Sequence, residues 1–289
     1  MPNMLLILTN YCEGYSDWLP ILRLRSSLIP LERYGIQIRT ILCVQYKSGK
    51  IKVPDEVRSH FSDVIYCHSL SISRARNSML QHCYNNYSLD SYVLILDDDC
   101  YVTAAAGAAL IRWMHIGCKD GILMGTPPWG IPMLFRKRRT INTGWLWQAF
   151  VWSTVFNLKT VRYHEFDECI GPGTNSLLQA GEDFLFMLSI IRSRKYSSIK
   201  FDDQFIMGHT ARGVFHQKKM RYSRGHAHAL LQAISNLDTL YMRLVLTMFV
   251  VAFIVRPCLR SVICGDRLAL ELTRHRLTSI IREIGNRFK

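Results

Sequence analysis

Ser91–Cys100 reads SYVLILDDDC, and this stretch decides the fold that we expect. The apolar run Tyr92–Leu96 is short for a helix and rich in branched side chains, so it predicts a strand buried on both faces. The strand ends at the adjacent carboxylates Asp97–Asp99. Open α/β sheets bind ligands at the carboxyl ends of their strands, so these acids predict a cation or ligand site. The alternative is a solvated turn in which an aspartate caps the helix expected over Thr103–Ala109.

Apolar runs and helical repeats alternate around this strand. The sequence predicts strands at Met4–Thr9, Ile36–Val44, Val64–Cys67 and Gly121–Gly125, and helices at Asp17–Tyr34, Ser73–Tyr87 and Thr103–Gly117. This alternation is typical of a doubly wound, mostly parallel α/β sheet. No G-x-G-x-x-G follows the first strand and no P-loop sequence occurs, so neither a dinucleotide-binding fold nor a P-loop is supported.

Composition narrows the class of protein. A chain of 289 residues with 49% hydrophobic residues forms one large domain or two small ones with a real core. Its nine cysteines are scattered and include no C-x-x-C pair, so we expect a reducing compartment and no zinc site. The N-terminus lacks a basic leader and is interpreted as a first strand, not a signal peptide.

The net charge of +14 calls for an acidic partner. Part of it lies in residues 236–289, where nine Lys and Arg stand against four acids beside the most apolar stretch of the chain. Nucleic-acid-binding chains more often interleave basic residues with exposed aromatics, so we expect no nucleic acid. Nucleotide phosphates and anionic lipid remain as partners.

A second informative stretch is Phe166–Ser193, FDECIGPGTNSLLQAGEDFLFMLSIIRS. Its glycines predict a tight loop, after which Glu182 and Asp183 open a helix. Acids in a first turn are favoured by the helix dipole, and that alone explains their position. A carboxylate at the mouth of a cleft can also serve as a general base. Further along, His209 and His216 lie among cations, either as structural histidines or in a lid over phosphates.

Together these segments resemble the family 2 glycosyltransferases of the GT-A fold, over most of residues 4–222. Four motifs carry the resemblance: Thr9-Asn10-Tyr11 after the first strand, Ser73-Arg74-Ala75-Arg76-Asn77 like S-x-A-R-N, Asp97-Asp98-Asp99 like D-x-D, and F-D-E…G-x-G…G-E-D between Phe166 and Asp183. Each motif is weak alone, but their order and spacing are specific. One departure is Val44-Gln45-Tyr46-Lys47, which stands where the family often has an acid after the second strand. Gln45 can hydrogen-bond a base, but this departure leaves the preference for UDP over other nucleotides open.

The resemblance implies a metal-dependent, inverting hexosyltransferase. It moves a sugar from a nucleotide-sugar, with UDP favoured, to an acceptor hydroxyl. The resemblance assigns Mn²⁺ or Mg²⁺ to Asp97 and Asp99 with His216, or as second choice His209. It makes Asp183 and Glu182 the catalytic residues, with Asp183 as the base. The other implied residues are Thr9, Asn10, Tyr11, Arg76, Asn77, Asp97 and Asp98 around the nucleotide-sugar, and Trp145, Trp147, Gly173 and Glu182 around the acceptor.

The C-terminal fifth differs in composition, so we divide the chain into a GT-A domain, 1–235, and helices, 236–289. Leu244–Val255 is a run of twelve apolar or near-apolar residues, shorter than a simple membrane span. Leu259–Phe288 mixes basic residues with leucine and isoleucine, as interfacial helices do. Similar tails occur in relatives that build lipid-linked bacterial surface polysaccharides. We therefore expect a peripheral or monotopic protein on the cytoplasmic face of the membrane, acting on a saccharide or lipid-linked acceptor. The alternative is a helical cap or an oligomer interface.

Two other functions compete with this interpretation. A sugar nucleotidyltransferase also holds a metal at a strand end, but it predicts a basic, glycine-rich loop after the first strand. Asn10–Asp17 contains one glycine and no Lys or Arg. A membrane-docked binding protein without catalysis would use the three aspartates only as a helix cap, and it would bind no nucleotide in a metal-dependent way.

Overall fold

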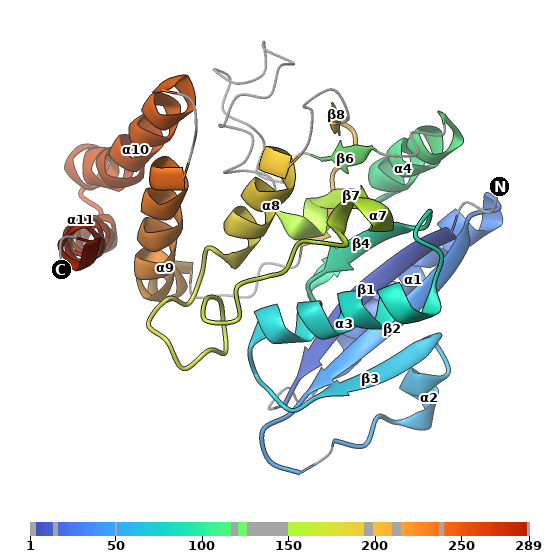
Figure 1. The fold of residues 1–289 in the computed structure, drawn as a ribbon. Coiled ribbons are helices and arrows are strands. Elements are labelled where there is room, and N and C mark those ends of the chain that lie inside the picture. The colour runs from blue at the N-terminus through green and yellow to red at the C-terminus, as the bar shows by residue number, and fades with distance from the viewer. Residues whose placement is uncertain are drawn as a thin grey trace.

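The computed structural model describes residues 4–13, 17–49, 51–116, 121–125, 150–193, 199–209, 215–236 and 240–287. Figure 1 shows the elements along the chain. The strands are β1 (Met4–Cys12), β2 (Gln37–Gln45), β3 (Asp63–Cys67), β4 (Tyr92–Leu96), β5 (Cys100–Tyr101), β6 (Ile122–Met124), β7 (Thr154–Asn157), β8 (Ile199–Phe201) and β9 (Gly208–His209). The helices are α1 (Leu19–Arg33), α2 (Asp55–Arg58), α3 (Ile72–Asn86), α4 (Ala104–Ile116), α7 (Leu158–Val161), α8 (Glu182–Ser193), α9 (Phe215–Asn236), α10 (Leu240–Cys264) and α11 (Arg267–Arg287), with a 3₁₀ turn at Val151–Ser153.

Among the described residues, seven strands form one sheet in the order β3-β2-β1-β4-β7-β6-β8. The four N-terminal strands are parallel, β7 runs antiparallel to both β4 and β6, and β8 is parallel to β6. The predicted mostly parallel α/β fold is therefore confirmed. The reversed strand β7 was not among the predicted strands.

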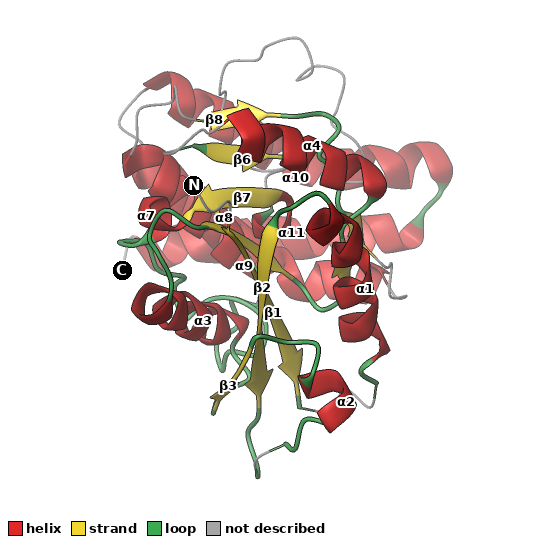
Figure 2. Cartoon of the chain, turned by 90° about the vertical axis from the view of Figure 1, so that its right-hand side faces the viewer, coloured by secondary structure: helices red, strands yellow, loops and turns green. Residues whose placement is uncertain are grey.

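Alternation along β1 explains why helices cover both faces of the sheet (Figure 2). Leu6 and Leu8 join the core cluster that contains residues of α3 and α8. Leu5 and Ile7 join the opposite cluster, which contains residues of α1 and α4. Successive side chains of a strand point to opposite faces, so a wholly apolar strand must be covered twice.

The starts of α4 and α3 are each capped by a hydroxyl side chain. Thr103 caps α4, because its Oγ1 accepts a hydrogen bond from the Ala106 N–H at 3.1 Å. The three aspartates are therefore not needed as that cap. The predicted start of α3 at Ser73 is wrong by two residues: Ser71 is the N-cap and accepts from the Arg74 N–H. Ser73 is buried inside the first turn and donates to the Ile170 carbonyl at 2.7 Å.

The C-terminal helices α9, α10 and α11 pack against one another. Gly225 of α9 lies so close to the preceding loop that a Cβ there would be 2.2 Å from the Ala180 carbonyl oxygen. Glu283 of α11 accepts a hydrogen bond from Arg224 at 3.1 Å and pairs with His228 at 2.9 Å, both on α9. Helix α9 thus joins the loop before α8 to the two terminal helices.

Candidate active site

Arg76 is the centre of the site. It lies in the first turns of α3 and is 2% exposed. Its Nη2 donates to Asp97 Oδ1 at 2.8 Å, and its Nη1 contacts Asp183 Oδ1 and lies 3.5 Å from Glu182 Oε1. Its guanidinium also lies over the Phe166 ring, 5.2 Å from the ring centroid. One side chain therefore joins α3, the end of β4 and the start of α8.

Burial makes the carboxylates of this cluster hard to ionise. It raises the pKa of Glu182 to about 8, and Asp183 adds to the effect while Arg76 opposes it. Burial likewise raises the pKa of Asp183, against the pull of Arg76. Burial lowers the pKa of Arg76, but the surrounding carboxylates raise it by more, so the guanidinium stays charged. At neutral pH Glu182 is thus mostly protonated, and Asp183 is the carboxylate that Arg76 orients.

The strand-end acids face two directions. Asp97 faces Arg76, whereas Asp99 Oδ1 lies 3.4 Å from His209 Nε2. The Cys100 sulfur lies close to Asp99 and His209, but burial and the neighbouring aspartates raise the pKa of this thiol well above its usual range. A neutral thiol is a poor ligand for Mg²⁺ or Mn²⁺, which favour oxygen. Asp99 and His209 are therefore the better ligand pair.

His209 owes its position to a short second sheet. Strands β5 and β9 pair with Cys100 opposite His209, and the His209 ring packs on Trp152 with centroids 5.6 Å apart. Our first choice from the sequence, His216, lies in α9, and its side chain is outside the described part of the structure. Within the described residues, it is our second choice, His209, that stands beside Asp99.

The predicted end of the first strand at Thr9 is wrong, because β1 continues to Cys12. Thr9 pairs with Leu96, so the last residues of β1 extend past the end of β4. Thr9 is wholly buried, and Asn10 is 6% exposed. Tyr11 stacks on Trp18 with ring centroids 3.6 Å apart. Burial raises the pKa of Tyr11, and the nearby carboxylates, including Asp98, add to the effect. Asp98 and Tyr11 therefore lie near each other at this edge of the sheet.

The hypothesis that Gln45 hydrogen-bonds the base is wrong. Gln45 is 1% exposed, and its Oε1 accepts from Asn10 Nδ2 at 3.0 Å. Its Nε2 donates to the carbonyls of Ser69 and Ser71 at 3.2 and 2.9 Å. Both ends of this buried amide are therefore engaged within the protein, and the side chain ties β1 and β2 to the segment that leads into α3.

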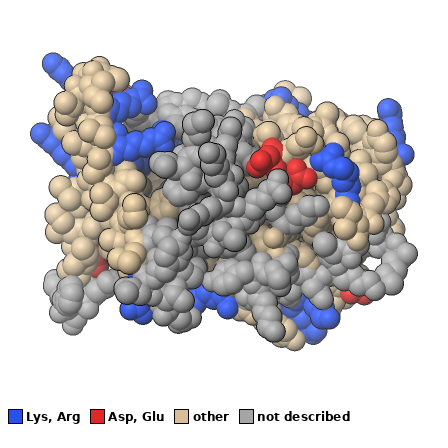
Figure 3. Space-filling view, turned by 90° about the horizontal axis from the view of Figure 1, so that it is seen from above, with Lys and Arg blue, Asp and Glu red and all other residues tan. Residues whose placement is uncertain are grey.

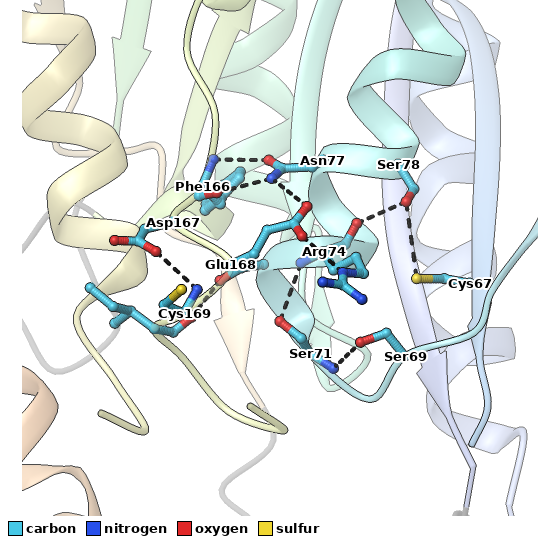
Figure 4. A network of polar contacts seen from close by, with 12 residues as sticks. Cys67, Ser69, Ser71, Arg74, Asn77, Ser78, Phe166, Asp167, Glu168 and Cys169 are labelled. Atoms are coloured by element: carbon cyan, nitrogen blue, oxygen red, sulfur yellow. Dashed lines mark hydrogen bonds and ion pairs between the residues drawn. The ribbon is translucent and has the colours of Figure 1, made fainter. Parts of the chain in front are cut away.

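Asn77 and Glu168 hold a loop against α3 (Figure 4). Asn77 accepts from the Phe166 N–H at 2.8 Å and donates to the Phe166 carbonyl at 2.9 Å and to Glu168 at 3.2 Å. Glu168 also pairs with Arg74 at 2.8 Å. Asn77 thus fixes the Phe166 ring next to Arg76, and its assignment to the nucleotide-sugar remains a prediction.

The glycine loop packs on the same helix start. Gly173 has φ +78°, and a Cβ there would lie 1.8 Å from the Leu70 carbonyl oxygen. Gly171 has φ +106° and packs against Glu182, so that a Cβ there would lie 3.0 Å from Glu182 Cδ. Trp145 and Trp147, the aromatic residues predicted at the acceptor, lie outside the described residues. The acceptor assignment of Gly173 stays a prediction.

The likeness of this chain to known proteins is one of structure and not of sequence. No protein-family model matches the sequence, and no curated protein sequence matches it. Among solved structures, the chain is similar to residues 1–349 of TarS from S. aureus, with a TM-score of 0.56 at 12% identity over 98% of this chain and 81% of that chain. Such similarities are to proteins of the GT-A fold, and they establish that fold for this chain.

A second group of similar structures is glucosyl-3-phosphoglycerate synthase from Mycobacterium tuberculosis. The complex with Mg²⁺ and UDP has a TM-score of 0.54 at 11% identity, over 82% of this chain and 81% of that chain. The complex with Mn²⁺, UDP-glucose and phosphoglyceric acid has a TM-score of 0.53 at 11% identity, over 82% of both chains.

Proposed function

We propose that this protein is a metal-dependent, inverting glycosyltransferase that uses a nucleotide-sugar, with UDP as the favoured nucleotide. One observation carries the proposal: Arg76 contacts both Asp97, at the strand end expected to face the donor, and Asp183, at the helix start expected to face the acceptor. One guanidinium thus contacts a carboxylate expected on the donor side and a carboxylate expected on the acceptor side. Similar folds bind UDP with Mg²⁺ or Mn²⁺ in their crystal structures, which supports the choice of donor and metal.

The residues at the strand end fit a divalent cation. Asp97 and Asp183 share a single guanidinium, so the cluster carries more negative than positive charge even with Glu182 protonated. Asp99 adds a carboxylate beside His209. Asp97 and Asp99 would hold Mn²⁺ or Mg²⁺, with His209 or His216 as a further ligand. Such a cation acts as a Lewis acid that stabilises the leaving diphosphate.

Asp183 is the group we assign to the acceptor. It accepts the proton of the acceptor hydroxyl as that oxygen bonds to the anomeric carbon. The bond from that carbon to the diphosphate oxygen breaks on the opposite side, and a nucleoside diphosphate leaves. Asp183 is 17% exposed, so an acceptor can reach it, whereas Glu182 is 8% exposed and mostly protonated near pH 7. Glu182 thus serves in acceptor binding and not as the base.

The remaining assignments follow the resemblance of the sequence. Thr9, Asn10, Tyr11 and Asp98 belong to the nucleotide side, and Trp145 and Trp147 belong to the acceptor side with Gly173. The acceptor is a saccharide or a lipid-linked saccharide of the kind used in cell-surface polysaccharide synthesis. This would place the protein at the cytoplasmic face of the cell membrane.

The first test is calorimetric binding of UDP and GDP to the purified chain, with and without Mn²⁺. We expect metal-dependent binding of UDP that Asp97→Asn with Asp99→Asn abolishes. The matched control is Asp55→Asn with Glu56→Gln, which removes two adjacent exposed carboxylates of α2. Failure of both nucleotides to bind in the presence of metal would refute the proposed donor site.

A second experiment separates the donor and acceptor roles. Asp183→Asn should keep metal-dependent UDP affinity within about twofold but lower the release of UDP from UDP-glucose by roughly 100-fold or more, because the general base is lost. Equal loss of UDP affinity in Asp183→Asn and in the Asp97 and Asp99 variant would contradict the assignment of Asp183 as base.

A further inference from the structure

Helix α10 carries an apolar stripe on the side that faces away from the rest of the protein. When successive residues are turned by about 100°, the exposed apolar side chains of the stripe fall within about 80° of the helix circumference. These residues are Leu244, Met248, Val251, Val255, Leu259 and Val262, with exposed fractions from 41% to 77%. The stripe is about 28 Å long at about 1.5 Å per residue. Solvent-facing sides of helices are normally polar, so this side has a partner.

The opposite side of α10 is already in use. Leu246 and Phe253 are buried, and α10 packs there on α9 and α11. Within α10, Leu246–Cys264 is long and apolar enough to cross a membrane, yet only 17% of it is buried. The helix continues through Pro257, past the point where the sequence predicted the apolar run to end. A partner can therefore contact only the outer side of α10.

A guanidinium on the inner side would make a spanning α10 costly. Pro257 has no N–H, which leaves the carbonyl of Phe253 without its helical donor. Arg276 of α11 supplies one, with Nη1 at 2.6 Å from this carbonyl, and lies 3.9 Å from the Phe253 ring centroid. A spanning α10 would carry Arg276 to the middle of the hydrocarbon, which is costly. A helix lying in the plane of the interface keeps Arg276 on the protein side.

Charge decides between a membrane and a second copy of the chain. Among the described residues of α10 and α11, the exposed charged side chains are Arg243, Arg256, Arg260, Arg267, Arg274 and Arg282 against Glu271. Figure 3 shows basic side chains beside uncharged surface at the end of the molecule where α10 lies in Figure 1. At about 100° per residue, Arg243 and Arg256 lie on the two sides of the stripe, about 120° and 100° from its centre. Two copies that met through the stripe would bring these like charges together, whereas an anionic lipid surface complements them.

We propose that the outer side of α10 lies flat on an anionic lipid surface, with its apolar stripe inserted and the flanking Arg243 and Arg256 at the headgroups. This proposal does not rest on glycosyl transfer, because it concerns a surface that no predicted site residue shares. It assigns binding to the interface plane and not to a transmembrane segment.

The test is co-sedimentation of the full chain with vesicles of phosphatidylglycerol and phosphatidylcholine, compared with vesicles of phosphatidylcholine alone. Three exposed stripe residues changed to Gln should lower the partition coefficient on anionic vesicles about 100-fold, since each inserted side chain contributes about fivefold. The variant is Met248→Gln, Leu259→Gln and Val262→Gln. The matched control changes similarly exposed apolar residues elsewhere and should bind as the unchanged chain does: Leu19→Gln, Tyr163→Gln and Leu177→Gln.

A second variant tests the charges. Arg243→Gln with Arg256→Gln should lower binding to anionic vesicles about 25-fold, because each arginine near such a surface contributes about fivefold. Arg33→Gln with Arg58→Gln, both exposed and distant in sequence, should change binding less than threefold. Equal binding by the stripe variant and its control would overturn the proposal. Sedimentation of the free chain as a dimer that the stripe variant dissociates would also overturn it, in favour of a second copy.

Discussion

Replacing Arg76 by Met tests whether this guanidinium holds the site together. The change leaves Asp97, Glu182 and Asp183 facing one another without their cation, at a position that is 2% exposed. Removing one partner of a buried ion pair typically costs about 3–5 kcal/mol in the free energy of unfolding. Arg74, two residues away on α3, supplies the matched control. It pairs with Glu168 at 2.8 Å, but the two side chains are 54% and 39% exposed. Arg74→Met should therefore cost far less than Arg76→Met.

The assay is urea unfolding followed by circular dichroism, with EDTA present so that no metal replaces the lost charge. Arg76→Lys keeps one charge but cannot reach Asp97 and Asp183 from two nitrogens at once, so its cost should fall between the two Met variants. In an Asp183→Asn background, the cost of Arg76→Met should shrink by at least about 1 kcal/mol. Equal and small costs for Arg76→Met and Arg74→Met, or no change in the Asp183→Asn background, would refute the reasoning.

Three further predictions use other parts of the site. The pKa of Glu182 is about 8 in the folded protein, against an ordinary value of 4.5, so the folded protein binds more protons than the unfolded chain between these pH values. The free energy of unfolding, measured by urea titration, should therefore fall by about 1 kcal/mol per pH unit as the pH rises from about 5 to 8. Glu182→Gln should remove this slope. Gly173→Ala should lower the thermal midpoint far more than Gly49→Ala, since both have positive φ but only Gly173 meets backbone within 4 Å. An equal shift in both would contradict the packing of the glycine loop. Asn77→Ala should lower the free energy of unfolding by about 2 kcal/mol, because its hydrogen bonds to the Phe166 backbone are lost. If Asn77 only holds the loop, UDP affinity should change less than threefold. A much larger loss of affinity would support the assignment of Asn77 to the nucleotide.

The local features of the site were readable from the sequence. Tyr92–Leu96 forms the predicted buried strand, and Asp97–Asp99 follow its carboxyl end as expected. Glu182 and Asp183 open a helix as predicted. Each of these depends on neighbouring residues: hydrophobic runs fix strands, and acids and glycines mark the starts and ends of helices.

Contacts between distant segments were not readable in the same way. The sequence left Gln45 free to meet a base, but the fold uses its amide for Asn10 and the Ser69–Ser71 segment. The Arg76 contacts join residues 21 and 107 positions apart, and no local pattern reports such a pairing. The reversed strand β7 is of the same kind, because strand neighbours are chosen by the packing of the whole sheet.

The sequence by itself determined the alternation of strands and helices, the carboxylates at a strand end and the apolar character of the C-terminal helices. Only the tertiary structure decided which groups meet: Arg76 with Asp97 and Asp183, and His209 with Asp99. It also decided which side of α10 is covered. The physical reason is that secondary structure follows from short-range propensity and periodicity, whereas charge pairing and exposure depend on which elements the folded chain brings together.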